Sequence, residues 1–565
     1  MNAPSKSFHR LFGTSPFLRR AVEAILFVIS FFVIQGYEFG DGNQHVFLPV
    51  ILSKLKAPQL AGDFGVTTHL FYHANFNALL TLMAHVIPLP LAAILLHIFS
   101  LLALYAGLAS VSECLGYKKT ELYLALGFLF LWAGSGMDGN VLWANRLEAQ
   151  YMAWPFALLA AASLTKGRPV PAGLWAGMTL LFHLQIGIFT GSLLFLFLFL
   201  DSRESFLKRL AGPGLFVLFC IPVFVQHFST IFREGLAHDA SFIDYATIRI
   251  PHHMNFDLRI FWVFIFLTAL QGMALRHAAD PQVVQARRRG LAISFFFLGL
   301  GLLQYLDYHI LKAGPVARLQ PLRMSPLTGL LGILALSSFL MSFSAQRHRS
   351  VGPMAAILAS FILGPRLMGY VSLREHPEYL AAAAAALILW LTSHRFKAPR
   401  AASPFFLWLP LISLLLMKRG PLQYDTRREL QNPWVETGAW IKTHTPREAL
   451  FITPPYFSGF AFYAERKTVV EFKSGVHHAK ALEGWRSRLQ DLSNGNFPAG
   501  CEKFSCRRSL EEGFKSLETP RIRELGRKYG ATFWVTEAGG KDPGLVRIFS
   551  NSHYEVFSLS ETGTA

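Results

Sequence analysis

Charged residues are scarce in this sequence, at 16% of its 565 residues, whereas 52% are hydrophobic. So little charge excludes an ordinary soluble enzyme and predicts a polytopic membrane protein. The net charge is +18, but the Lys and Arg stand in short runs between apolar segments. That distribution is typical of cytoplasmic loops, and no nucleic-acid-binding motif accompanies it, so we expect no nucleic-acid partner.

Cysteine is also rare, with 4 in the whole chain. Their spacing matches no zinc motif, and their number excludes a disulfide scaffold. The polar part of the chain after Lys418 lacks a Walker A loop, a GxGxxG motif after a strand and a GxSxG motif. These absences leave no signal there for binding a nucleotide phosphate or for a serine nucleophile.

Apolar runs divide residues 1–417 into about thirteen predicted transmembrane helices. Arg19 and Arg20 precede the first run, so we expect a cytoplasmic N-terminus and an external first loop at 37–88. Residues 171–200 are too long for one ordinary span. We interpret them as a membrane hairpin, because a single helix would place the basic residues that follow it on the external side.

The composition becomes polar in residues 418–565, which we predict to be a soluble, external α/β domain. Asn432 and Pro433 are typical of a helix start, as are Thr519 and Pro520. Short β-type runs are predicted to form strands at 449–453, 468–472, 531–537 and 554–559. A cap without chemistry and a catalytic role are both open for this domain.

The first external loop concentrates the ionisable residues that the membrane part otherwise lacks. Ionisable groups at the mouth of a span indicate a functional site. Asp41 lies just beyond the first span between two glycines, which let the backbone approach a ligand closely. We predict Asp41 as the catalytic carboxylate, with Glu38 and Asp63 as alternatives. The structural alternative is that Asp41 only caps a short helix beginning near Asn43.

Three stretches together resemble a known class of membrane enzymes. They are DGNQHVFLPVIL with AGDF in the first loop, FHLQIG in the hairpin, and WIKTHTPREALFITPPYFSGFAFYAERKTVVEFK in the tail. With the predicted spans, they resemble the bacterial C-type (GT-C) glycosyltransferases, in a poorly described branch. The resemblance implies a GT-C-like fold that uses a sugar carried on a polyprenyl phosphate.

The resemblance also implies roles for individual residues. Asp41, or Glu38, matches the acidic residue of the first loop. The paired motif of the second loop matches Asp138 and Asn140, although its second member is often acidic. The resemblance therefore implies a divalent cation, Mg or Mn, held by Asp41, Asp138 and Asn140. The candidates for binding the donor phosphate are Arg318, Arg323, Arg366 and His183. For the arginines the alternative is an interfacial anchor, and for His183 it is helix packing.

The function implied is transfer of a sugar from the lipid donor to an envelope glycan, lipid or protein. The reaction would take place on the external face of a bacterial inner membrane. Two alternatives stay open: a non-catalytic partner subunit in envelope polysaccharide assembly, and a transporter or flippase of lipid-linked sugars. Protein partners are not indicated by the sequence.

The last two cysteines, Cys501 and Cys506, lie close together in the predicted external domain. Close cysteines in an oxidising compartment form disulfides. We therefore predict a bond between them.

Overall fold

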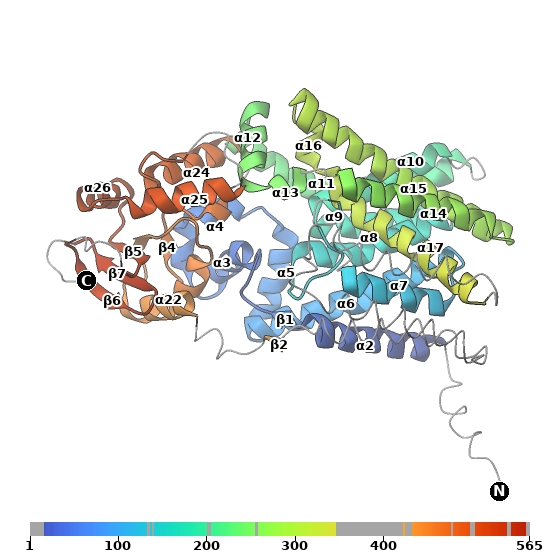
Figure 1. Ribbon diagram of the computed structural model, residues 1–565, viewed down its shortest axis with the longest axis horizontal. Coiled ribbons are helices and arrows are strands. Elements are labelled where there is room, and N and C mark those ends of the chain that lie inside the picture. The colour runs from blue at the N-terminus through green and yellow to red at the C-terminus, as the bar shows by residue number, and fades with distance from the viewer. Residues whose placement is uncertain are drawn as a thin grey trace, which may run out of the picture.

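The computed structural model shows a bundle of long helices and, at one end of it, a smaller α/β domain (Figure 1). The structure describes residues 16–132, 136–137, 140–200, 205–254, 258–345, 422–423, 432–475, 478–497, 503–539 and 544–560. Segments of the first loop lie between the bundle and the α/β domain.

The bundle consists of long apolar helices. They are α2 (Pro16–Gln35), α6 (Leu89–Cys114), α7 (Lys119–Trp132), α8 (Ala149–Thr165), α9 (Pro169–Phe182), α10 (Leu184–Leu200), α11 (Phe206–Glu234), α14 (Leu258–Arg276), α15 (Pro281–Tyr305) and α17 (Ser325–Ala345). In the described residues, 4 helical stretches are long and apolar enough to cross a membrane: Leu89–Cys114, Phe206–His227, Pro281–Leu311 and Pro321–Ser342. The protein therefore has the helices of a polytopic membrane protein. The predicted spans within 346–421 lie outside the described residues, so the count of about thirteen stays a prediction.

Small residues let the helices of the bundle approach closely. α9 crosses α11 where Gly173 faces Gly212, and a Cβ atom at Gly173 would lie 2.2 Å from the Gly212 carbonyl oxygen. On α8, Ala153, Ala157 and Ala161 are buried in the core of the bundle. Because lipid gives apolar helices little reason to associate, such close van der Waals packing is what holds them together.

The segment predicted as a hairpin consists of α9 and α10, with a break at His183. His183 has an extended backbone at φ −147° and ψ 109°, which ends α9. Its Nδ1 accepts a hydrogen bond from the Ile186 N–H at 3.4 Å, in the first turn of α10. α9 and α10 contact each other, and both contact α8 and α11.

Basic residues from distant parts of the chain meet at one end of the bundle. Arg20 pairs with Glu113 at 2.8 Å, and Lys119 pairs with Glu23. The Arg287 Nε donates to the Leu115 carbonyl at 2.9 Å. The N-terminal helix and the turns after α6 and α14 therefore share one end, as the positive-inside interpretation requires.

The first loop begins directly after α2. It contains β1 (Tyr37–Glu38), α3 (Gln44–Leu55), the 3-10 helix η1 (Pro58–Gly62), α4 (Phe64–His69) and α5 (Ala74–Ala84). β1 pairs in parallel with β2 (Leu422–Gln423), in the register Tyr37 to Leu422.

Further short helices follow α11 and α15 in the chain. They are α12 (Asp239–Arg249), α13 (Pro251–Met254), the π-helix η2 (Leu306–Leu311), α16 (Pro315–Leu319) and the 3-10 helix η3 (Pro321–Met324). α12 contacts α25 (Lys503–Lys515) of the C-terminal domain.

The C-terminal domain contains a 5-stranded sheet in the order β4-β3-β5-β7-β6. Its strands are β3 (Leu450–Ile452), β4 (Lys467–Thr468), β5 (Phe533–Glu537), β6 (Val546–Ser550) and β7 (Tyr554–Ser558). β4, β3 and β5 are parallel, and β7 and β6 run antiparallel. Its helices are α22 (Pro433–His444), α23 (Phe460–Ala464), η5 (Phe472–Ser474), α24 (Ala479–Leu492), α25 (Lys503–Lys515) and α26 (Thr519–Tyr529).

Helices cover both faces of this sheet. Successive strand residues point to opposite faces, so Phe533 and Val535 join one core and Trp534 joins the other. The first core holds Trp434 of α22, and the second holds Trp485 of α24. The predicted α/β fold is confirmed for the described part of this domain.

Candidate active site

Asp41 lies in the turn between β1 and α3, at the mouth of the bundle. Gly40 and Gly42 on either side of it have φ of +81° and +60°, values that L side chains rarely adopt. The Asp41 side chain is 54% exposed, and its Oδ2 lies 3.0 Å from the Arg146 Nη1. The N-cap of α3 is Asn43, and only the Asp41 backbone carbonyl bonds to Gln44 N. The Asp41 side chain is therefore directed at Arg146 rather than used as a cap.

Arg146 gathers three carboxylates around one guanidinium. Its Nη1 lies 3.8 Å from Glu38 as well as 3.0 Å from Asp41, and its Nε donates to Glu148 at 2.9 Å. The guanidinium also packs over Gly42, where a Cβ atom would lie 2.5 Å from Cζ. A glycine is therefore required at 42 by both the backbone conformation and the arginine.

Glu38 and Asp41 differ in acidity although they are close together. Burial and the neighbouring Asp41 charge raise the pKa of Glu38. Burial also acts to raise the pKa of Asp41, but the Gly42 N–H and the Arg146 charge outweigh it and lower that pKa. Paired carboxyls whose environments move their pKa values apart are typical of acid–base sites. Asp41 is thus the more acidic member of the pair and is ionised at neutral pH.

The C-terminal domain contributes to the same turn. The Lys473 Nζ donates a hydrogen bond to the Gly42 carbonyl, and the Tyr463 hydroxyl donates to the Gly40 carbonyl at 2.7 Å. Burial, then Arg249, lowers the pKa of Lys473 to about 8, while Glu148 and Asp41 counteract this. Lys473 therefore places a second positive charge beside Asp41 at neutral pH.

His45 supports the turn but does not contact the Asp41 carboxylate through any bond that the structure records. Its Nε2 lies 2.6 Å from the Gly40 carbonyl, and its Nδ1 lies 3.0 Å from Ser458 Oγ. Burial and the Lys473 charge lower the pKa of His45 to about 4. A neutral ring with its proton on Nε2 satisfies both partners. His45 thus joins the first loop to the C-terminal domain.

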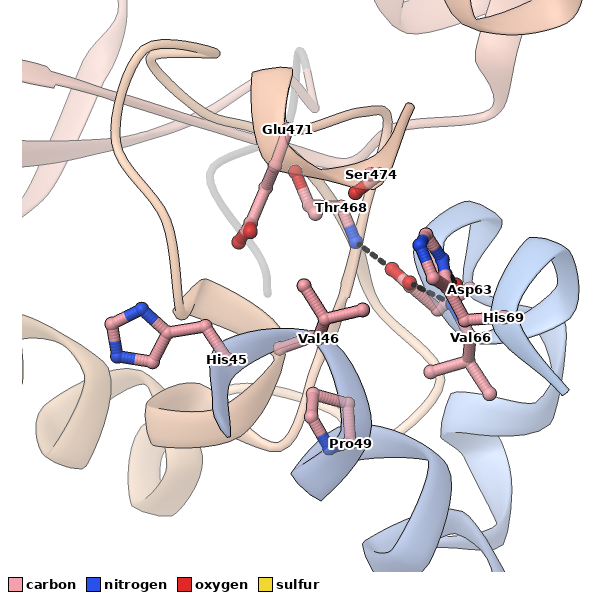
Figure 2. A pocket seen from close by; sticks show the side chains of 11 residues that line it. His45, Val46, Pro49, Asp63, Val66, His69, Thr468, Glu471 and Ser474 are labelled. Atoms are coloured by element: carbon pink, nitrogen blue, oxygen red, sulfur yellow. Dashed lines mark hydrogen bonds between the residues drawn. The ribbon is translucent and has the colours of Figure 1, made fainter. Parts of the chain in front are cut away.

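Asp63 has a different position, in a small cavity between the first loop and the C-terminal domain (Figure 2). One carboxylate oxygen accepts from Val66 N at 3.1 Å, which caps α4, and the other accepts from Thr468 N at 2.8 Å. The side chain is buried. Both oxygens are thus occupied, so we retain Asp41 and Glu38 as the catalytic candidates and consider Asp63 a tether between the two parts.

A second buried carboxyl, Glu471, lines the same cavity (Figure 2). It accepts from Gly459 N at 3.1 Å and from Phe460 N at 2.8 Å. Burial raises the pKa of Asp63 to about 6 and that of Glu471 to about 7.

We expect the contact between the first loop and the C-terminal domain to weaken as the pH rises. Each carboxyl binds its proton more tightly in the folded protein than in the unfolded chain. Its stabilising contribution is therefore complete below about pH 4 and is lost as the pH rises through about 6 to 7. For Asp63, the change from 3.8 to about 6 corresponds to on the order of 3 kcal/mol.

The measurement is thermal unfolding of the purified protein from pH 5 to pH 8. Buried histidines such as His45, whose pKa is lowered to about 4, make the whole protein more stable as the pH rises toward 6.5, so the carboxyls are read from the difference between the wild type and each variant. The stability of the wild type relative to Asp63→Asn should fall over the lower part of the range, and that relative to Glu471→Gln over the upper part, because neither amide ionises. A melting temperature that rises with pH equally in all three proteins would contradict this account.

The predicted phosphate-binding residues separate into two environments. Arg318 is held by Asp239 at 2.8 Å and by the Ala237 carbonyl, and it stacks over the Phe242 ring at 4.6 Å. Arg323 is buried, and its Nε donates to the Gln320 side chain at 2.7 Å. Arg366 lies outside the described residues.

Arg323 lies in the same region as His183 and the candidate catalytic loop. The ring of His183 lies against the ring of His73, which belongs to the first loop, with the two ring centroids 4.8 Å apart. The positive charge of Arg323 interacts with both rings. Tyr151, at the start of α8, interacts electrostatically with both Arg146 and Arg323. Arg323 therefore lies near His183 and His73, and Tyr151 is within electrostatic range of both arginines.

The predicted metal ligands are only partly described. Asn140 is buried, with its Nδ2 3.4 Å from the His253 Nδ1, and Asp138 lies outside the described residues. Within the described ranges, no group of three or more His, Cys, Asp or Glu side chains is arranged to hold a metal ion. The metal set of Asp41, Asp138 and Asn140 stays a prediction.

The predicted disulfide is also only half within the described chain. Cys506 is buried and disulfide-bonded. Cys501 lies outside the described residues, so the pairing of the two stays a prediction.

Sequence reasoning missed Arg146, Glu148, Tyr463 and Lys473. Arg146 and Glu148 stand in NRLEAQ, directly before α8, and two charges at the mouth of an apolar helix were a usable signal. Tyr463 and Lys473 had no such signal, because their partners are the backbone carbonyls of Gly40 and Gly42.

Part of the chain matches a family model, and the chain as a whole is similar to a solved structure. Residues 432–492 match a family model described as "Domain of unknown function (DUF6798)". That segment includes Tyr463, Thr468 and Lys473, which contact the first loop. No curated protein matches the sequence. Among solved structures, the chain is similar to ArnT from Cupriavidus metallidurans in the apo state, at 14% identity over 96% of this chain and 97% of that chain, with a TM-score of 0.48. A likeness this distant carries no argument about function, which must come from the residues of the chain itself.

Proposed function

We propose that this protein is a GT-C-type glycosyltransferase. It transfers a sugar from a polyprenyl-phosphate donor to an envelope glycan, lipid or protein on the external face of the bacterial inner membrane. The observation that carries the proposal is the ionised and half-exposed Asp41 at the mouth of the bundle, paired with Glu38 and held by Arg146. A carboxylate in that position can take the proton of an acceptor hydroxyl while the donor lipid stays in the membrane.

The second requirement of the reaction is a cation for the phosphate of the donor. Arg323 supplies a guanidinium of which only Nε has a recorded hydrogen bond, to Gln320. The planar group of an arginine binds two phosphate oxygens at once. The gathering of Arg20, Lys119 and Arg287 at the opposite end of the bundle supports an external position for Asp41 and for the C-terminal domain.

Mass spectrometry of envelope glycans tests this function. We expect deletion of the gene to remove one sugar from one class of envelope glycan, and the wild-type gene to restore it. Asp41→Asn should be inserted in the membrane but should not restore the sugar. Restoration by Asp41→Asn would favour the non-catalytic partner subunit, and unchanged glycans in the deletion strain would contradict glycan transfer.

A further inference from the structure

We propose that the Arg146 guanidinium takes the place of a divalent cation in the acidic site at Asp41. The inference rests on the proposed function and concerns the charge balance of the same site. It goes beyond the resemblance, which implied a metal held by Asp41 and the second loop. The structure instead brings an arginine of the second loop to Asp41.

The geometry around Arg146 is that of carboxylates around a central cation. Glu38 and Asp41 approach its Nη1 at 3.8 Å and 3.0 Å, and Glu148 approaches its Nε at 2.9 Å. These acids come from two loops that are far apart in the sequence. They share one positive centre, which offsets the repulsion between them.

A metal ion would have to compete with two fixed positive charges. Arg146 lies among the carboxylates, and Lys473 is close enough for its charge to interact with Asp41 and Glu148. Together the two side chains supply the charge of one divalent ion at neutral pH. These two positive charges offset most of the charge of Glu38, Asp41 and Glu148, so the site attracts a further cation much more weakly than three bare carboxylates would.

The backbone at Gly42 leaves room for the Arg146 side chain. Its guanidinium lies over Gly42, where a side chain would collide with Cζ at 2.5 Å. Its side chain is 26% exposed. In the part of the chain that the structure describes, its Nη2 has no recorded hydrogen bond, whereas Nε and Nη1 bind Glu148 and Asp41. Because the side chain is partly exposed and Nη2 is not engaged by these acids, Nη2 can bind an oxygen of the donor phosphate.

The transfer step then needs no other cation at Asp41. The oxygen of the acceptor forms a bond to the sugar as the bond between the sugar and the phosphate oxygen breaks. The electron pair of the broken bond leaves with the phosphate, whose charge the guanidinium of Arg146 neutralises together with that of Arg323. The proton of the acceptor hydroxyl goes to Asp41.

Binding of Mn²⁺ to the purified full-length protein, measured by electron paramagnetic resonance, tests the inference. The wild type and Asp41→Asn should show the same weak signal of bound Mn²⁺. Arg146→Ala leaves the three carboxylates without their cation, so it should bind one additional Mn²⁺ per chain. The double variant Arg146→Ala, Asp41→Asn should lose that ion. Arg318→Ala, which removes an arginine elsewhere, should gain none.

Two results would overturn the inference. One is Mn²⁺ bound to the wild type and lost in Asp41→Asn, which would show that a metal occupies the site despite Arg146. The other is a folded Arg146→Ala or Arg146→Gln protein that gains no Mn²⁺, with folding verified by its melting temperature. Neither result depends on glycan transfer. That activity is tested separately, by whether the Asp41→Asn gene restores the missing sugar in the deletion strain.

Discussion

Asp41→Asn is expected to lower the rate of sugar transfer roughly a hundredfold or more, the usual loss when a general base is removed. The amide keeps the size of the side chain and can still accept a hydrogen bond from Arg146, so the fold should be retained. It cannot take a proton from an acceptor hydroxyl. The rate is measured in membrane vesicles as incorporation of a labelled sugar from the lipid-linked donor.

Asp239→Asn is a matched control for this variant. Asp239 is 58% exposed and lies 2.8 Å from an arginine, close to the 54% and 3.0 Å of Asp41. It contacts Arg318 in another loop and should transfer sugar at nearly the wild-type rate. Near wild-type transfer by a folded Asp41→Asn protein would move the catalytic role to Glu38 or support the non-enzymatic alternative.

Arg323→Lys should also lower transfer, by roughly a hundredfold, which is the usual effect of losing one donor that stabilises a developing negative charge. Lysine keeps the positive charge but loses the planar pair of donors that binds two phosphate oxygens. It also loses the bond from Nε to Gln320, which orients the guanidinium at 2.7 Å. Transfer is measured in the same vesicles over a range of donor concentrations.

Arg318→Lys serves as the comparison for Arg323→Lys. The Arg318 guanidinium is engaged by Asp239, the Ala237 carbonyl and the Phe242 ring. Its replacement should therefore affect the packing of α12 more than the transfer rate. If Arg318→Lys abolishes transfer while Arg323→Lys retains it, the phosphate site lies at Arg318 instead.

The helices and strands that the sequence predicted are those with strong local signals. The break near His183 was predicted because the apolar stretch that contains it is too long for one span. The starts of α22 and α26 were predicted from Asn432–Pro433 and Thr519–Pro520. The buried strands β3, β5 and β7 were predicted from β-branched and aromatic residues. β6 was missed because Val546–Ser550 is largely exposed at the edge of the sheet and lacks an alternating apolar pattern.

The sequence by itself determined that this is a membrane chain with a polar C-terminal domain and that Asp41 follows the first helix between two glycines. Those features depend on composition and on neighbouring residues. Only the tertiary structure decided which partners Asp41 has, because Arg146 and Lys473 are brought to it from another loop and another domain. It also distinguished Asp63 from Asp41, although both are acids in the same loop. Asp63 is buried against Thr468, whereas Asp41 is half-exposed. Local sequence cannot determine this difference, because it depends on how distant segments pack.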